Sequence, residues 1–142
     1  MKNSHVPASL RLVGWLALFW NLVGVVMFLM QTGLSAEQIA AMPPERRMVF
    51  EAMPGWLTVA YAVGVFGGAL GAFGLLVRRR WAVAAFGASL LAVVANMVGI
   101  YVHTPAWQVS GAAGLPLGIL LIAIAGWLFW YARRAASRGW IR

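Results

Sequence analysis

Apolar residues fill four long stretches of the chain, at about residues 10–31, 54–77, 81–102 and 111–132. None of the stretches contains Asp, Glu or Lys, and their only Arg is Arg11, at the start of the first. Each is close in length to the ~20 residues that a helix needs to cross a bilayer. The pattern predicts an all-α membrane protein, in which four transmembrane helices form an up-down-up-down bundle.

The first connection, residues 32–53, is the one long polar segment between the stretches. Ser35 and Gln38 have the spacing of a capping box, which predicts a short helix that starts there and stops at Pro43 and Pro44. Pro44 can begin a second short helix that Pro54 ends. Both helices are expected to lie along the membrane surface, as a connector, a lid or a docking surface.

The other two connections are short, at residues 78–80 and 103–110. Short loops make consecutive helices antiparallel neighbours. Four spans use most of the 142 residues, so residues 1–142 are expected to form a single integral membrane domain.

Composition agrees with a membrane protein, because 63% of the residues are hydrophobic and 10% are charged. The net charge of +8 does not point to nucleic acid, since the basic residues lie at the ends of the spans. Nine share one side of the bundle: Lys2, Arg11, Arg78, Arg79, Arg80, Arg133, Arg134, Arg138 and Arg142. Arg46 and Arg47 lie on the other side with all three acidic residues, Glu37, Glu45 and Glu51. The positive-inside rule therefore predicts that both termini are cytoplasmic.

Tryptophan residues fall near the predicted span ends, where their amphipathic rings settle at the level of the lipid headgroups. Four are expected to act as interface anchors: Trp56, Trp81, Trp107 and Trp140. Trp20 is different, because its position places it near the middle of the bilayer. It is expected to be a contact within the bundle or a surface on which a ligand stacks.

Small residues recur every four positions in the second stretch, which allows another helix to approach closely. The residues of this stripe and its flanks are Ala60, Gly64, Gly67, Gly68, Gly71 and Ala72. Ala84, Ala88 and Ala92 of the third stretch are expected to form a matching stripe. The motif serves packing inside one bundle or a homodimer face.

Few polar side chains lie within the spans, and Asn21, Ser89 and Asn96 are the most informative. Buried amides need hydrogen-bond partners, so these residues should point into the bundle. They are expected to join helices to one another. The alternative is a polar cavity that they form with Trp20 for a neutral hydroxyl-rich or amide-bearing molecule.

No arrangement typical of catalysis appears in the sequence, which has no Cys, no paired intramembrane carboxylates and no phosphate-binding loop. His5 and His103 lie at opposite ends of the predicted bundle, which argues against a metal site. We expect no enzyme activity, no cofactor and no bound metal.

Several segments resemble a family of small bacterial four-span inner-membrane proteins that are sometimes labelled "sugar transporter". They are residues 19–24 (FWNLVG), 53–56 (MPGW), 66–71 (FGGALG), 75–82 (LLVRRRWA) and 139–141 (GWI). The resemblance implies a bacterial inner-membrane location and a possible transport role. The size is also similar to that of small multidrug exporters, but the first span lacks their acidic residue.

Two functions follow as expectations. The first is a bundle that packs with a partner, either another membrane component or a second copy of the chain. The second is an uncoupled transporter of a small neutral solute such as a sugar, acting as a homo-oligomer, because uncharged lining residues offer no proton or sodium coupling.

Overall fold

The structure is a computed structural model that describes residues 5–142, and Lys2 lies outside the described residues. The helices in chain order are α1 (Ala8–Thr32), α2 (Ala36–Ala40), α3 (Pro44–Ala52), α4 (Gly55–Leu76), α5 (Trp81–His103), α6 (Ala106–Ser110), the 3₁₀ helix η1 (Gly111–Gly114) and α7 (Leu115–Ser137). Four helical stretches are long and apolar enough to cross a membrane: α1, α4, α5 and the stretch that ends with α7. The chain is therefore an all-helical, multi-pass membrane protein over the described range.

The first three predicted spans agree with α1, α4 and α5 to within two residues at each end. The fourth predicted span, residues 111–132, lies within the apolar helical stretch Ala106–Ser137, but α7 itself begins only at Leu115, after α6 and η1. Gly111 has a φ of 53°, which interrupts the helical path. Pro116 lies in the first turn of α7, where a proline fits without the loss of a helical hydrogen bond.

The segment between α1 and α4 folds as its sequence predicts. The Ser35 hydroxyl accepts a hydrogen bond from the Gln38 backbone N–H at 3.2 Å, and the Gln38 side chain accepts one from the Ser35 N–H at 2.9 Å. Pro44 begins α3, which ends at Ala52, before Pro54. The predicted capping box and both short helices are confirmed.

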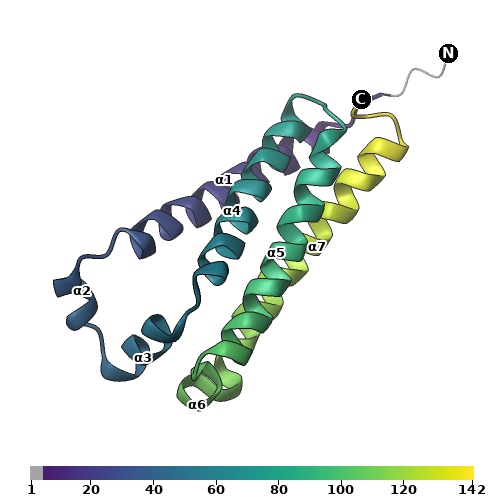
Figure 1. The fold of residues 1–142 in the computed structure, drawn as a ribbon. Helices are drawn as coiled ribbons and strands as arrows, with labels where there is room; N and C mark the ends of the chain where they lie inside the picture. Colours follow the sequence, from purple (N-terminus) through teal and green to yellow (C-terminus); the bar gives the residue numbers. More distant parts are fainter. Residues whose placement is uncertain (1–4) are drawn as a thin grey trace.

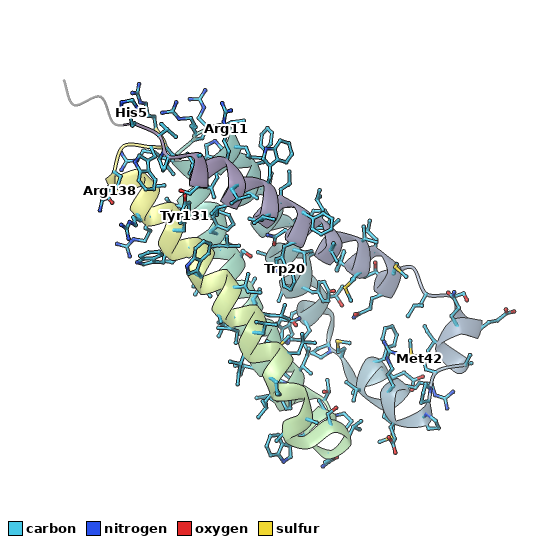
Figure 2. All side chains as sticks on the ribbon, turned by 180° about the vertical axis from the view of Figure 1, so that it is seen from behind. His5, Arg11, Trp20, Met42, Tyr131 and Arg138 are labelled. Carbon is cyan, nitrogen blue, oxygen red and sulfur yellow. The ribbon has the colours of Figure 1, made fainter. Side chains whose placement is uncertain are left out.

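The four long helices alternate in direction, and they are arranged as an open arc (Figure 1). The pairs that pack along their length are α1 with α4, α4 with α5, and α5 with α7. No such packing joins α1 to α7. Figure 2 shows these two helices close at the end that carries Tyr131 and apart at the end that carries Met42.

The closed end of the arc contains the packed core. Leu10, Phe86, Leu128 and Tyr131 belong to one cluster of buried residues, to which α1, α4, α5 and α7 all contribute. Ser9 Oγ and Tyr131 Oη lie 3.2 Å apart and link α1 to α7 at this end. The beginning of α1 and the C-terminus lie at this end, whereas α2, α3 and α6 lie at the opposite end (Figure 1).

The segment after α7 folds back onto the loop between α4 and α5. The backbone N–H of Arg80 donates to the Arg142 carbonyl oxygen at 2.9 Å, and the N–H of Arg142 donates to the Arg78 carbonyl oxygen at 2.8 Å. Arg78 has a φ of 59°, and its Nε donates to the Trp140 carbonyl oxygen at 2.9 Å. Ile141 is buried in the core cluster. This segment, residues 140–142, holds the ends of α5 and α7 together.

Candidate functional site

A cavity of about 430 Å³ lies inside the arc and is lined by side chains of α1, α4, α5 and α7. All four residues that the sequence suggests for a polar cavity line it: Trp20, Asn21, Ser89 and Asn96. The structure therefore brings together residues from two helices that are far apart in the chain. Most of the remaining lining is aliphatic or aromatic.

The cavity has a closed end and an open side. Phe86 and Leu128 line it and also belong to the core cluster, so packed side chains close it toward the end of the bundle that carries Tyr131. Side chains that line it from α1 and α7 stay exposed, with 41% of Trp20, 58% of Met27 and 63% of Leu117 accessible. The cavity is therefore open along the gap between α1 and α7.

Two of the polar side chains connect α5 to α4. Ser89 Oγ donates to the Gly64 carbonyl oxygen at 2.6 Å, and Asn96 Nδ2 donates to the Leu57 carbonyl oxygen at 2.8 Å. The donors are seven residues apart on α5 and the acceptors are seven apart on α4, so each pair sits two helical turns from the other. The predicted hydrogen bonding between helices is found at both residues.

Asn21 behaves differently from Asn96. Its Nδ2 donates to the carbonyl oxygen of Ala17, in its own helix, at 2.8 Å. Its Oδ1 lies against Gly68 of α4, so closely that a Cβ at Gly68 would overlap it. Asn21 thus joins α1 to α4 by contact with a glycine, rather than by a hydrogen bond from its amide nitrogen.

Asn21, Ser89 and Asn96 each leave a side-chain oxygen as an acceptor, and each asparagine also keeps its second amide N–H. Each residue donates one hydrogen bond to a backbone carbonyl oxygen. Because a carbonyl oxygen cannot donate, these bonds establish which side-chain atom of Asn21 and Asn96 is the nitrogen and which is the oxygen. Asn21 is 8% exposed and Asn96 is 5% exposed, and no fully buried side-chain N or O atom in the described range lacks a partner. The side-chain oxygens are left as acceptors beside the cavity.

The small-residue stripe of α4 packs inside the bundle and contacts two helices. Gly68 faces Asn21 of α1, whereas Gly64, Gly67 and Gly71 face α5. The Phe86 ring lies 2.9 Å from the place where a Cβ on Gly71 would stand. Ala72 is fully buried in the core cluster, and Ala60 lines the cavity.

The matching stripe expected on α5 is wrong. Ala84 and Ala88 are exposed, and α4 instead meets the face of α5 that carries Phe86, Ser89 and Asn96. An almost wholly apolar helix gives no signal of which face is inside, so spacing alone did not decide between the two faces.

Residues near the open end of the cavity were missed by the sequence analysis. Gln31, Thr58 and Tyr61 line it, and the Tyr61 ring packs 5.2 Å from the ring of Phe28. Their position in the ends of α1 and α4 that lie next to α2 and α3 is a signal that the cavity reaches this end of the bundle. The sequence alone does not show this role, because it does not reveal that α1 and α7 diverge.

Charge is kept away from the cavity. No Asp, Glu, Lys, Arg or His lines it. In the described part of the chain, no three His, Cys, Asp or Glu side chains gather to hold a metal ion. Arg133 and Arg134, at the closed end, lie over the rings of Phe129 and Trp130 at 5.8 and 5.4 Å.

The predicted anchors lie at helix ends. Trp56 and Trp81 lie in the first turns of α4 and α5 and are about half exposed, and Trp107 in α6 is also exposed. Trp140 is half-buried and packs against the core cluster, 6.3 Å from the Tyr131 ring. Trp140 therefore contributes to the packing of the closed end.

Comparison of the chain with protein-family models, with curated proteins and with solved structures finds no match. The resemblance to small four-span inner-membrane proteins therefore rests on the sequence segments that carry it.

Proposed function

We propose that the protein is a non-catalytic membrane protein that binds another membrane component in the cavity between α1 and α7. The observation that carries this proposal is the open arc. Three neighbouring helix pairs pack along their length, whereas α1 and α7 leave between them a cavity lined mainly by apolar side chains. An apolar surface of this kind is stable in lipid and accessible to molecules dissolved there.

The lining favours a membrane component over an ion or a reactive substrate. A charged ligand would need a compensating charge in the low-dielectric interior, and the lining supplies none. The cavity also lacks a paired acid and base or a nucleophile with its base, which supports a binding role rather than an enzymatic one.

The arginines support an orientation with both termini in the cytoplasm of a bacterial cell, and with α2 and α3 on the outer face of the inner membrane. Arg78, Arg79, Arg80, Arg133 and Arg134 lie at one end of the bundle, whereas α2 and α3 carry all three acidic residues. Basic residues are retained on the cytoplasmic side of such membranes. In this orientation the end of the bundle at which α1 and α7 diverge faces outward (Figure 2).

A second candidate is the uncoupled transport of a small neutral solute, which the family resemblance also suggests. One observation favours it: Trp20, Asn21, Ser89 and Asn96 line a single uncharged cavity. Transport would require the core around Phe86 and Leu128 to open, since these residues close the cavity. Uptake of a panel of sugars and polyols into proteoliposomes tests this candidate. Saturable uptake that is lost in Asn21→Ala would favour it over simple binding.

The binding proposal is tested by access of lipid to the cavity. The chain has no native cysteine, so Ala125→Cys on the cavity wall can be labelled alone with a bimane fluorophore in nanodiscs. Ala123→Cys is a matched reference on the exposed side of α7, and Arg138→Cys is one beyond the helix end. A neutral brominated single-chain lipid added to the nanodiscs should quench bimane at Ala125 nearly as strongly as at Ala123. Quenching as weak as at Arg138 would overturn the proposal.

A further inference from the structure

We infer that the cavity selects a neutral, single-chain lipid-like molecule whose polar group donates a hydrogen bond, with a long-chain alcohol as the simplest case. This inference rests on the proposed function, namely that the cavity holds a membrane component. It adds the size, the charge and the hydrogen-bonding character of that component.

The size of the cavity argues for a small molecule. The cavity has a volume of about 430 Å³. The volume lies within the range of about 300–1,000 Å³ that is usual for small-molecule pockets.

The lining favours a ligand whose main part is apolar and uncharged. Met27, Val93 and Leu121 are typical of the walls, which come from α1, α5 and α7. A carboxylate, phosphate or ammonium group would lose its hydration there and gain no ion pair. The ligand is therefore neutral, and one chain suits a cavity of this volume better than two.

The polar atoms of the lining favour a hydrogen bond in which the ligand is the donor and the protein is the acceptor. Asn21, Ser89 and Asn96 each donate to a backbone carbonyl oxygen and keep a side-chain oxygen as an acceptor. Asn21 contacts α4 at Gly68, and the other two donate to Gly64 and Leu57. At 1.5 Å per residue these contacts follow α4 at intervals of about 6 and 10 Å. A hydroxyl group can donate to these oxygens and can also accept from the second N–H of Asn21 or Asn96, whereas a ligand that only accepts forms one hydrogen bond fewer.

Photolabelling in nanodiscs of phosphatidylcholine and phosphatidylglycerol tests the inference. Three probes carry a diazirine on the same carbon of a sixteen-carbon chain: the alcohol, its methyl ether and the corresponding carboxylate. The ether keeps the chain and the oxygen but cannot donate. Mass spectrometry of the digested protein should show several-fold more labelling of cavity peptides of α1 and α7 by the alcohol than by the ether, about fivefold for one hydrogen bond. The carboxylate should label no better than the ether.

Two variants of α7 assign the labelling to the cavity. Ala125→Phe fills the cavity and removes no hydrogen bond, whereas Ala123→Phe adds the same ring on the exposed side of the helix. Labelling by the alcohol should fall several-fold in Ala125→Phe and stay unchanged in Ala123→Phe. Equal labelling by alcohol and ether, lost from both in Ala125→Phe, would overturn the donor requirement and leave the binding function standing. Labelling by the carboxylate equal to that by the alcohol would overturn neutrality. Labelling that no variant reduces would overturn both the inference and the proposed function.

Discussion

The side-chain oxygen of Asn21 lies against Cα of Gly68, and a Cβ at position 68 would overlap it. A Cα–H group can form a weak hydrogen bond with such an oxygen, and such contacts recur at helix–helix interfaces. The contact sets the approach of α1 to α4 near the middle of the bundle. It also holds the amide beside the cavity, so one pair of residues serves both the packing and the candidate site.

Gly68→Ala should destabilise the protein, because the added methyl group must displace the Asn21 amide. Overpacking of this kind costs about 1–3 kcal/mol. Gly126→Ala is the matched control, since a Cβ at that position of α7 meets no atom within 4 Å. Unfolding in a mixed-micelle denaturation series measures both variants. Equal stabilities for the two would contradict the packing of Asn21 on Gly68.

Ser89→Ala should weaken the association of α4 with α5, because it removes the hydrogen bond to the Gly64 carbonyl oxygen. Hydrogen bonds between transmembrane helices contribute about 0.6 kcal/mol on average. Ser137→Ala removes a hydroxyl that bonds within its own helix, to the Arg134 carbonyl oxygen, and serves as the control. The same denaturation series should show a loss for Ser89→Ala alone. A loss for Ser137→Ala as large as that for Ser89→Ala would argue against a bond between the helices.

Arg78→Val should loosen the closed end of the bundle. A left-handed backbone costs a residue other than glycine about 1–2 kcal/mol, and a branched Cβ raises this cost. The variant also loses the hydrogen bond from Arg78 Nε to Trp140. Arg79→Val, at an exposed neighbour whose φ is not positive, should have little effect. Limited proteolysis within residues 138–142 should be faster in Arg78→Val, and equal rates in the two variants would refute the role of Arg78.

Cysteine labelling tests the orientation. Ser35→Cys and Ser137→Cys lie at opposite ends of the bundle and are both exposed. A membrane-impermeant maleimide should label Ser35→Cys in intact spheroplasts, and it should label Ser137→Cys only after the membrane is permeabilised. The reverse pattern would place the arginine-rich end outside.

The local structure was predictable where one short motif decides it. Ser35 with Gln38 specifies the start of α2, and Pro44 specifies the start of α3, because both act through neighbouring backbone groups. Span positions followed from apolar length for three of the four long helices. The start of α7 depends on the η1 turn at Gly111–Gly114, which length alone does not reveal.

The arrangement of the helices was less predictable. Helices that are apolar on every side do not show which face is buried. The alanine stripe on α5 therefore predicted the wrong face, whereas Ser89 and Asn96 lie on the face that contacts α4. The pairing of Arg80 with Arg142 depends on backbone groups that carry no sequence signal. The gap between α1 and α7 depends on how all four long helices are arranged. Individual residues of the candidate cavity could therefore be predicted from the sequence, but the shape of the cavity could not.

Native mass spectrometry of the protein in nanodiscs formed directly from membranes of the expressing cells shows whether the cavity holds a ligand. We expect a bound molecule of discrete mass that is neutral and extractable with lipid, present on the wild-type protein and on Ala123→Phe and absent from Ala125→Phe. A spectrum without a bound molecule, or one in which Ala125→Phe retains it, would contradict the claim that the cavity between α1 and α7 is a binding site.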